Sequence, residues 1–254
     1  MWSIYAGIPI FLGLGAVAVP VSSDTPKDSW EFGNSLFYLG PPSGSAEIIK
    51  ATYSILAPAV PSGYVSSDDD PVWVSIWVGA SASESDNNVD LYQPLFNWSP
   101  DQEAQGCPAS TEEWCVAAST YTPDSQIGQS YIIVPANTTL DFEIAVEDEN
   151  VIQTVTMAGK VISKQSDALD YPLQYLLSSD ECYTGSGSCG SIDEWYIRNL
   201  TVTLSEADSS FSSVFELDGV TAADLTTSDS GTTWHTEWIK ITSIDFENSS
   251  DLDE

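Results

Sequence analysis

Alternation between apolar and other side chains in residues 71–80 is the feature that most constrains the fold. One face of this segment, if extended, carries Val72, Val74, Ile76 and Val78, and the other carries Trp73, Ser75, Trp77 and Gly79. A period of two predicts a β-strand. The aliphatic face suits a core between two sheets, and the face with Trp, Ser and Gly suits a concave surface that meets a ligand.

Similar segments recur along the chain, and no long helical period appears. We expect strands at 30–39, 47–60, 71–80, 89–98, 114–121, 130–134, 140–146, 151–161, 194–204, 211–220, 232–239 and 240–246, with a short helix or loop at 167–177. This spacing is typical of an all-β fold, an antiparallel β-sandwich or jelly roll of two packed sheets. The 254 residues suffice for one large all-β domain with a sizeable core.

The amino terminus has the composition of an export signal. Residues 4–19 are almost all apolar or small, and Ala16-Val17-Ala18 offers a plausible cleavage site. The apolar run is too short for a comfortable transmembrane helix. We therefore expect a signal peptide at 1–18, a mobile segment at 19–45, the sandwich at 46–247 and an acidic tail at 248–254, in a secreted, extracellular protein.

Cysteines and glycosylation sequons agree with export. Each of two short loops is flanked by two cysteines, so that the spacing favours the pairs Cys107–Cys115 and Cys182–Cys189 among the three pairings that four cysteines allow. The sequence N-x-S/T occurs at four positions, which are Asn97, Asn137, Asn199 and Asn248. Each is a predicted glycan site in a secreted chain.

The charge balance is strongly acidic, with 38 Asp and Glu against six Lys and Arg and a net charge of −32 at pH 7. Without a basic patch, nucleic acid and anionic membrane surfaces are not expected partners. Near pH 3 to 4, at about the reference pKa values of Asp and Glu, much of the repulsion between carboxylates disappears. We therefore expect a monomer that is suited to acidic surroundings.

Several kinds of site are excluded by composition. His235 is the only histidine, which excludes a two-histidine metal site and makes a Ser-His-Asp triad implausible. The G-x-G-x-x-G spelling at 185–190 lies in a cysteine loop and not in a βαβ unit, so it predicts no dinucleotide site. We expect no metal and no cofactor, and any acid–base chemistry must come from Asp or Glu.

Three short motifs occur in an order that resembles the eqolisins, which are secreted fungal glutamic peptidases active at acid pH with a concanavalin A-like β-sandwich fold. The family pattern runs W-V-G-I-D, then L-Q-[TA]-G, and later A-E-W-I-V. This chain has Trp77-Val78-Gly79-Ala80-Ser81, Leu91-Tyr92-Gln93-Pro94-Leu95 and Asp193-Glu194-Trp195-Tyr196-Ile197. It departs from the pattern at Ser81, at Tyr92 and at Pro94-Leu95.

The resemblance implies roles for four residues. Glu194 would be the general base that activates water, and Gln93 would donate its amide to the oxyanion. Trp77 would line the cleft, and Trp195 would also contact the polypeptide substrate. Because of the departures from the family motifs, the chain can also be interpreted as a divergent or inactive member of the family.

Two other functions stay open at this stage. One is a non-catalytic, lectin-like sandwich that binds cell-wall polysaccharide on an aromatic concave face. The other is a glycan hydrolase or lyase on the same fold, which would need two facing carboxylates about 5 to 9 Å apart if it were a hydrolase. The peptidase requires that Gln93 and Glu194 converge on one face, roughly within one bridging water.

Overall fold

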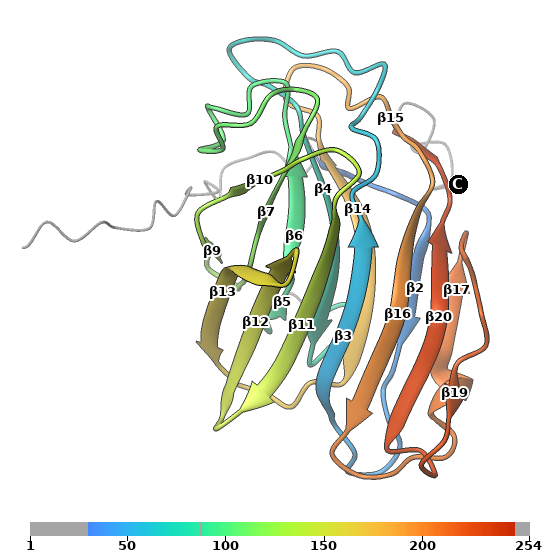
Figure 1. The fold of residues 1–254 in the computed structure, drawn as a ribbon. Helices are drawn as coiled ribbons and strands as arrows, with labels where there is room; N and C mark the ends of the chain where they lie inside the picture. The colour runs from blue at the N-terminus through green and yellow to red at the C-terminus, as the bar shows by residue number, and fades with distance from the viewer. Residues whose placement is uncertain (1–29, 87, 247–254) are drawn as a thin grey trace, which may run out of the picture.

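The computed structural model describes residues 30–86 and 88–246, and two antiparallel sheets packed face to face dominate it (Figure 1). This arrangement confirms the all-β sandwich that the strand pattern predicts. The expected signal peptide at 1–18, the acidic tail at 248–254 and the sequon residue Asn248 lie outside the described residues.

One sheet has 11 strands, and its main path runs in the order β10 (Ile132–Val134), β7 (Trp114–Ala117), β6 (Leu95–Trp98), β4 (Trp73–Ser81), β14 (Tyr175–Tyr183), β2 (Leu36–Leu39) and β17 (Phe215–Asp218). Four short strands join it beside this path: β1 (Trp30–Phe32), β5 (Leu91–Tyr92), β8 (Ser119–Tyr121) and β9 (Gln126–Gly128).

The other sheet has eight strands, in the order β13 (Lys160–Ala168), β12 (Asn150–Met157), β11 (Thr139–Glu147), β3 (Ile48–Leu56), β16 (Trp195–Leu204), β20 (Thr233–Ile241) and β18 (Thr221–Ala222), with β19 (Thr226–Thr227) also beside β20. A two-stranded sheet pairs β15 (Ser191–Ile192) with β21 (Ile244–Asp245). A 3₁₀ turn, η2 (Phe211–Val214), precedes β17.

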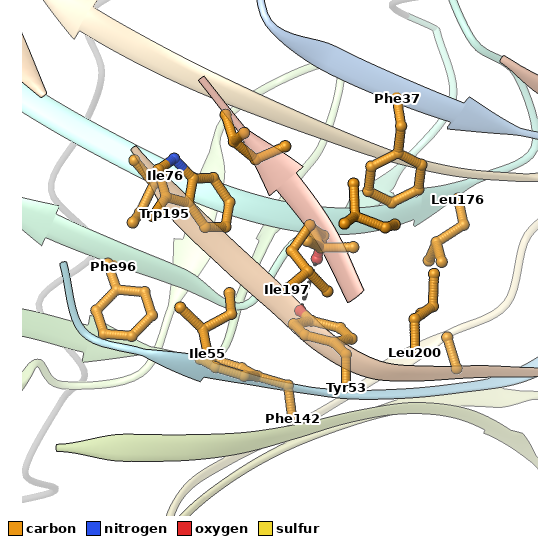
Figure 2. Close-up of a cluster of buried hydrophobic side chains, with 14 of the residues drawn as sticks. Phe37, Tyr53, Ile55, Ile76, Phe96, Phe142, Leu176, Trp195, Ile197 and Leu200 are labelled. Atoms are coloured by element: carbon orange, nitrogen blue, oxygen red, sulfur yellow. Dashed lines mark hydrogen bonds between the residues drawn. The ribbon is translucent and has the colours of Figure 1, made fainter. Parts of the chain in front are cut away.

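The hydrophobic core lies between the two large sheets. Figure 2 shows side chains from both of them meeting there, including Phe37 and Ile76 from one sheet and Ile55 and Ile197 from the other. The aliphatic face of β4 is fully buried in this core, as its alternation predicts. The Tyr53 hydroxyl also crosses the core and donates a hydrogen bond of 2.9 Å to the Val78 carbonyl.

Several expected segments differ in the structure: 114–121 and 151–161 are each divided between two strands, and 211–220 begins with the 3₁₀ turn η2. The strand expected at 89–98 is divided into β5 and β6 around Gln93 and Pro94, and Pro94 has no N–H to donate to a ladder. The region 167–177, expected to be a short helix or a loop, is a loop only at 169–174, between β13, which ends at Ala168, and β14, which begins at Tyr175. Strands β1 and β2 lie inside the expected segment 19–45, so the sandwich begins before residue 46.

Both local disulfides form, Cys107–Cys115 and Cys182–Cys189, with the pairing that their spacing predicts. Cys115 lies in β7 and Cys182 in β14, so each bridge ties a loop to a strand of the 11-stranded sheet. Disulfides of this kind persist in oxidising compartments. They are consistent with an exported protein.

A carboxyl group lies inside the core. Asp180, on the core side of β14, is 1% exposed, and its Oδ1 accepts a hydrogen bond of 3.1 Å from the Trp195 indole in the opposite sheet. Its Oδ2 has no hydrogen-bond partner. Burial raises the pKa of Asp180 from 3.8 to about 8, although the Trp195 hydrogen bond opposes part of the rise.

This buried carboxyl predicts that the protein is most stable in acid. The pKa is higher in the folded than in the unfolded chain, so the contribution of Asp180 to stability is complete below about pH 4 and is lost as pH rises toward about 8. Asp180→Asn keeps an oxygen for Trp195 but cannot ionise. We expect the melting temperature of the wild type to fall more between pH 4 and pH 7 than that of this variant.

The matched control is Asp193→Asn, which removes one charge from an exposed position. Differential scanning calorimetry at both pH values measures the three proteins. If the decrease in melting temperature is the same for Asp180→Asn and for the wild type, ionisation of Asp180 does not limit stability.

Candidate functional site

The structure does not bring Glu194 and Gln93 together. Glu194 precedes β16 in the eight-stranded sheet, its side chain is 49% exposed, and it forms an ion pair with Lys240. This ion pair is the main reason that the pKa of Glu194 is lowered. Gln93 lies between β5 and β6 in the 11-stranded sheet and is buried. The convergence that the peptidase mechanism requires is absent from the described structure.

Trp195 is also placed differently from its expected role in substrate binding. It is 2% exposed and lies in the core between the sheets (Figure 2). Its indole N–H donates a hydrogen bond to Asp180. The strand alternation explains the difference, because Trp195 and Ile197 are the first two residues of β16 whose side chains point into the core. Trp195 is therefore a core residue.

The predicted glycan sites differ in the solvent exposure of their asparagine side chains. Asn137 and Asn199 are exposed, and both have positive φ angles, 58° and 52°, that asparagine tolerates better than most residues. Glycosylation there remains a prediction. Asn97 is 2% exposed, and its Oδ1 accepts a hydrogen bond from Ser75, so its side chain is not available to carry a glycan in the folded protein.

Trp77 lies on the side of β4 that faces away from the core, as the alternation predicts. We call this surface the outer face of the 11-stranded sheet. The strand register assigns the following residues to it: Trp73, Ser75, Trp77 and Gly79 on β4, Leu177, Ser179, Glu181 and Tyr183 on β14, Leu95 and Asn97 on β6, and Phe32 and Trp30 on β1. Trp77, Leu95 and Leu177 form a buried apolar cluster there, separate from the main core. Partly buried tyrosines, including Tyr38 and Tyr131, pack against this cluster.

Gln93 belongs to the same outer face. A Cβ atom added at Gly79 would lie 3.1 Å from the Gln93 Cβ and 2.9 Å from the Leu91 Cδ1. Gly79 therefore permits this close packing. Gly79 is four residues from Ser75 along β4. Gln93, beside Gly79, is therefore roughly 13 Å along the strand from Ser75 and from Glu181, which is opposite Ser75. Trp77 occupies the intervening row.

Three buried polar atoms on the outer face have no hydrogen-bond partner: Trp77 Nε1, Gln93 Oε1 and Asn97 Nδ2. The part of the chain that the structure describes contains only five such atoms, and the other two belong to Gln165 and Asp180. Partnerless buried polar groups are costly, because nothing replaces the water that they lose. Their concentration on one face makes that face the strongest candidate for a ligand site.

Glu181 is the functional candidate that the sequence analysis missed. It is half-buried on β14, directly opposite Ser75, which in turn is opposite Asn97. Burial raises the pKa of Glu181 to about 7, and the polar N–H of the Trp77 indole beside the carboxyl opposes part of this rise. The alternation in Ser179-Asp180-Glu181-Cys182 could have identified this residue, had the segment been interpreted as a strand.

Aromatic rings extend the outer face beyond Glu181. Tyr183 lies between Trp30 and Trp73, with ring centroids 5.3 Å and 5.5 Å apart and tilted planes. All three are half-buried, so part of each ring remains accessible. The exposed Phe32 is directly opposite Glu181. Together these residues form a contiguous aromatic surface beside the carboxyl group.

The two large sheets differ in charge. All basic residues in the described part of the chain lie on strands of the eight-stranded sheet, and they are Lys50, Lys160, Lys164, Arg198 and Lys240. The 11-stranded sheet contains none of them. Its outer face therefore has no cation that could pair with an anionic ligand.

Comparisons with known proteins give distant structural similarities. No family model and no curated protein matches the sequence. Among solved structures, the galectin LEC-6 of Caenorhabditis elegans is similar with a TM-score of 0.32 at 10% identity, covering 63% of this chain and 97% of that one. A β-1,3-1,4-glucanase from a mouse hindgut metagenome has a TM-score of 0.34 at 10% identity, covering 86% and 94%.

A family 16 endo-glucanase from Bacteroides ovatus has the same TM-score of 0.34 at 10% identity, covering 85% of this chain and 86% of that one. In the described residues, no helix is sufficiently long and apolar to span a membrane.

Gly79→Ala should disturb the outer face. The added Cβ would overlap Leu91 and Gln93, and overpacking of this kind typically costs about 1–3 kcal/mol. We expect the free energy of unfolding, measured by urea titration, to fall by that amount. Gly128→Ala in β9 of the same sheet is the control, because its Cβ would make only an ordinary 3.4 Å contact with Ser119. Equal stability of the two variants would contradict the close packing.

Proposed function

We propose that this protein is a non-catalytic, extracellular, lectin-like sandwich that binds a glycan on the outer face of the 11-stranded sheet. The observation that carries the proposal is that aromatic rings and three partnerless buried polar atoms occur together on that face. Ligand sites typically combine apolar and aromatic walls with a few converging polar groups.

The aromatic row supports binding of a chain of sugars. Trp30, Tyr183 and Trp73 present ring surfaces on which the apolar faces of sugar rings can pack, and these side chains lose little conformational freedom on binding. Glu181 and Asn97 lie in the neighbouring row and supply hydrogen-bonding groups for hydroxyls. Stacking and hydrogen bonding are therefore available within one surface.

The charge distribution favours a glycan without acidic groups. The protein has a net charge of −32, and the 11-stranded sheet has no basic residue in its described strands. A uronate or sulfate would meet only like charge on this face, and like charges in an interface oppose binding.

A hydrolytic function has less support. A glycosidase usually needs two carboxyl groups flanking the scissile bond. The positions that adjoin Glu181 on the outer face are Ser75, Phe32, Ser179 and Tyr183, and none of them is a carboxylic acid. The glutamic-peptidase alternative rests on Glu194 and Gln93, which adjoin strands of different sheets.

Binding to an array of neutral, acidic and amino glycans tests the proposal. We expect binding of at least one non-acidic glycan, and Trp73→Ala should weaken it by about fivefold or more, as loss of a central aromatic contact does at interfaces. Trp238→Ala, a half-buried tryptophan of β20 in the other sheet, is the control and should bind normally. Failure to bind any glycan would refute the proposal.

A protein-digestion assay tests the peptidase alternative directly. At about pH 3, below the reference pKa of Glu, we expect no cleavage of a denatured protein substrate. Cleavage that is lost in both Glu194→Gln and Gln93→Ala would restore the glutamic-peptidase hypothesis and show that these two residues converge in solution.

A further inference from the structure

We propose that the outer face of the 11-stranded sheet recognises an acetamido group, so that its ligand is a glycan containing an N-acetylated hexosamine. This inference rests on the proposed glycan-binding function and specifies the sugar. It follows from the chemistry of the partnerless atoms and from the apolar side chains beside them.

The partnerless atoms include both donors and an acceptor. The Trp77 indole and the Asn97 amide each offer an N–H, whereas the partnerless carbonyl oxygen belongs to Gln93, which lies further along the outer face. Trp77 and Asn97 are 4% and 2% exposed, so a ligand that left their N–H groups unpaired would leave a large desolvation penalty in place. The ligand therefore needs an acceptor near Trp77 and Asn97.

Glu181 provides the complementary group. It lies across Ser75 from Asn97 in the same row, so an amide placed over Ser75 could accept a hydrogen bond from Asn97, or from Trp77 in the next row, and donate its own N–H to the Glu181 carboxyl. A carboxyl group accepts such a bond in either protonation state. Ser75 does not compete for the Asn97 amide nitrogen, because its hydroxyl donates to Oδ1 at 3.0 Å.

The apolar cluster accounts for the methyl end of the group. Leu95 is directly opposite Trp77 on β6, and Leu177 packs in the same cluster. The partnerless N–H donors of Trp77 and Asn97 therefore lie next to aliphatic side chains. An acetamido group fits this combination, because it has a methyl, a carbonyl and an N–H close together. A hydroxyl lacks the methyl, and an ammonium group lacks an acceptor for the Trp77 and Asn97 donors.

Access to these atoms requires displacement of a covering side chain. Tyr131 precedes β10 and packs against the cluster of Trp77, Leu95 and Leu177. It belongs to the connection between β9 and β10, which is a short surface segment. Movement of such a connection when a ligand enters is common at binding sites. Of the four side chains that pack against this cluster, only Tyr131 lies outside a strand, and we expect it to move when the acetamido group enters.

Monosaccharide titrations followed by NMR test the inference without dependence on linkage. The probes are N-acetylglucosamine and N-acetylgalactosamine. The comparison sugars are glucose, galactose and glucosamine, which differ from the probes in the group at carbon 2. We expect the N-acetylated sugars to bind at least tenfold more tightly than the hydroxyl or amino sugars. Sites built around hydrogen-bonding groups reject ligands that leave those groups unpaired.

Two variants separate recognition from folding. Trp77→Phe removes the indole N–H but keeps an aromatic ring, and we expect it to reduce the preference for N-acetylglucosamine over glucose by about fivefold. Trp238→Phe makes the same change on the other sheet and should keep the full preference. The wild-type selectivity is measured independently of either variant, so a variant that does not fold leaves the test intact.

The outcomes distinguish this inference from the proposed function. Equal affinity for glucose and N-acetylglucosamine would overturn acetamido recognition and leave glycan binding in place. A preference for an N-acetylated amino-acid amide over N-acetylglucosamine would overturn it in favour of a peptide ligand. If neither the monosaccharides nor any glycan on the array binds, both proposals fail.

Discussion

The pleat of β4 and β14 is the constraint on which the rest of the structure depends. Successive residues on these strands point to opposite faces, so one alternation fills the core and the other forms the candidate site. Val74 and Ile76 are fully buried between the sheets, while Ser75 and Trp77 face outward. A slip of one residue in this pairing would exchange the two sets, and the buried core therefore also fixes the register of the candidate site.

The same pleat separates two neighbouring carboxyl groups. Asp180 points into the core and Glu181 lies on the outer face, and burial raises the pKa of both, to about 8 and about 7. Each therefore favours a folded protein that retains protons to a higher pH than the unfolded chain. The acidic composition and the buried carboxyls lead to the same expectation, a protein suited to acidic surroundings.

The sequence predicted the sandwich, the outward position of Trp77 and the disulfide pairing, because each depends on local spacing. It did not predict that Gln93 and Glu194 lie in different sheets. Short motifs on separate strands do not specify which sheet each strand joins, and that depends on pairings between distant segments. Glu181 was missed because no strand was expected between residues 161 and 194, so that β14 was not recognised.

The two disulfides have a further consequence for folding. Their cysteines are only 8 and 7 residues apart in sequence, so each bridge closes a small loop. By contrast, β4 pairs with β14 and β2 pairs with β17 over much longer stretches of chain. Chains dominated by such distant contacts fold slowly. Because the bridges restrict the unfolded chain only locally, they contribute little to bringing distant strands together. The order of the strands in each sheet must therefore arise from burial of the core.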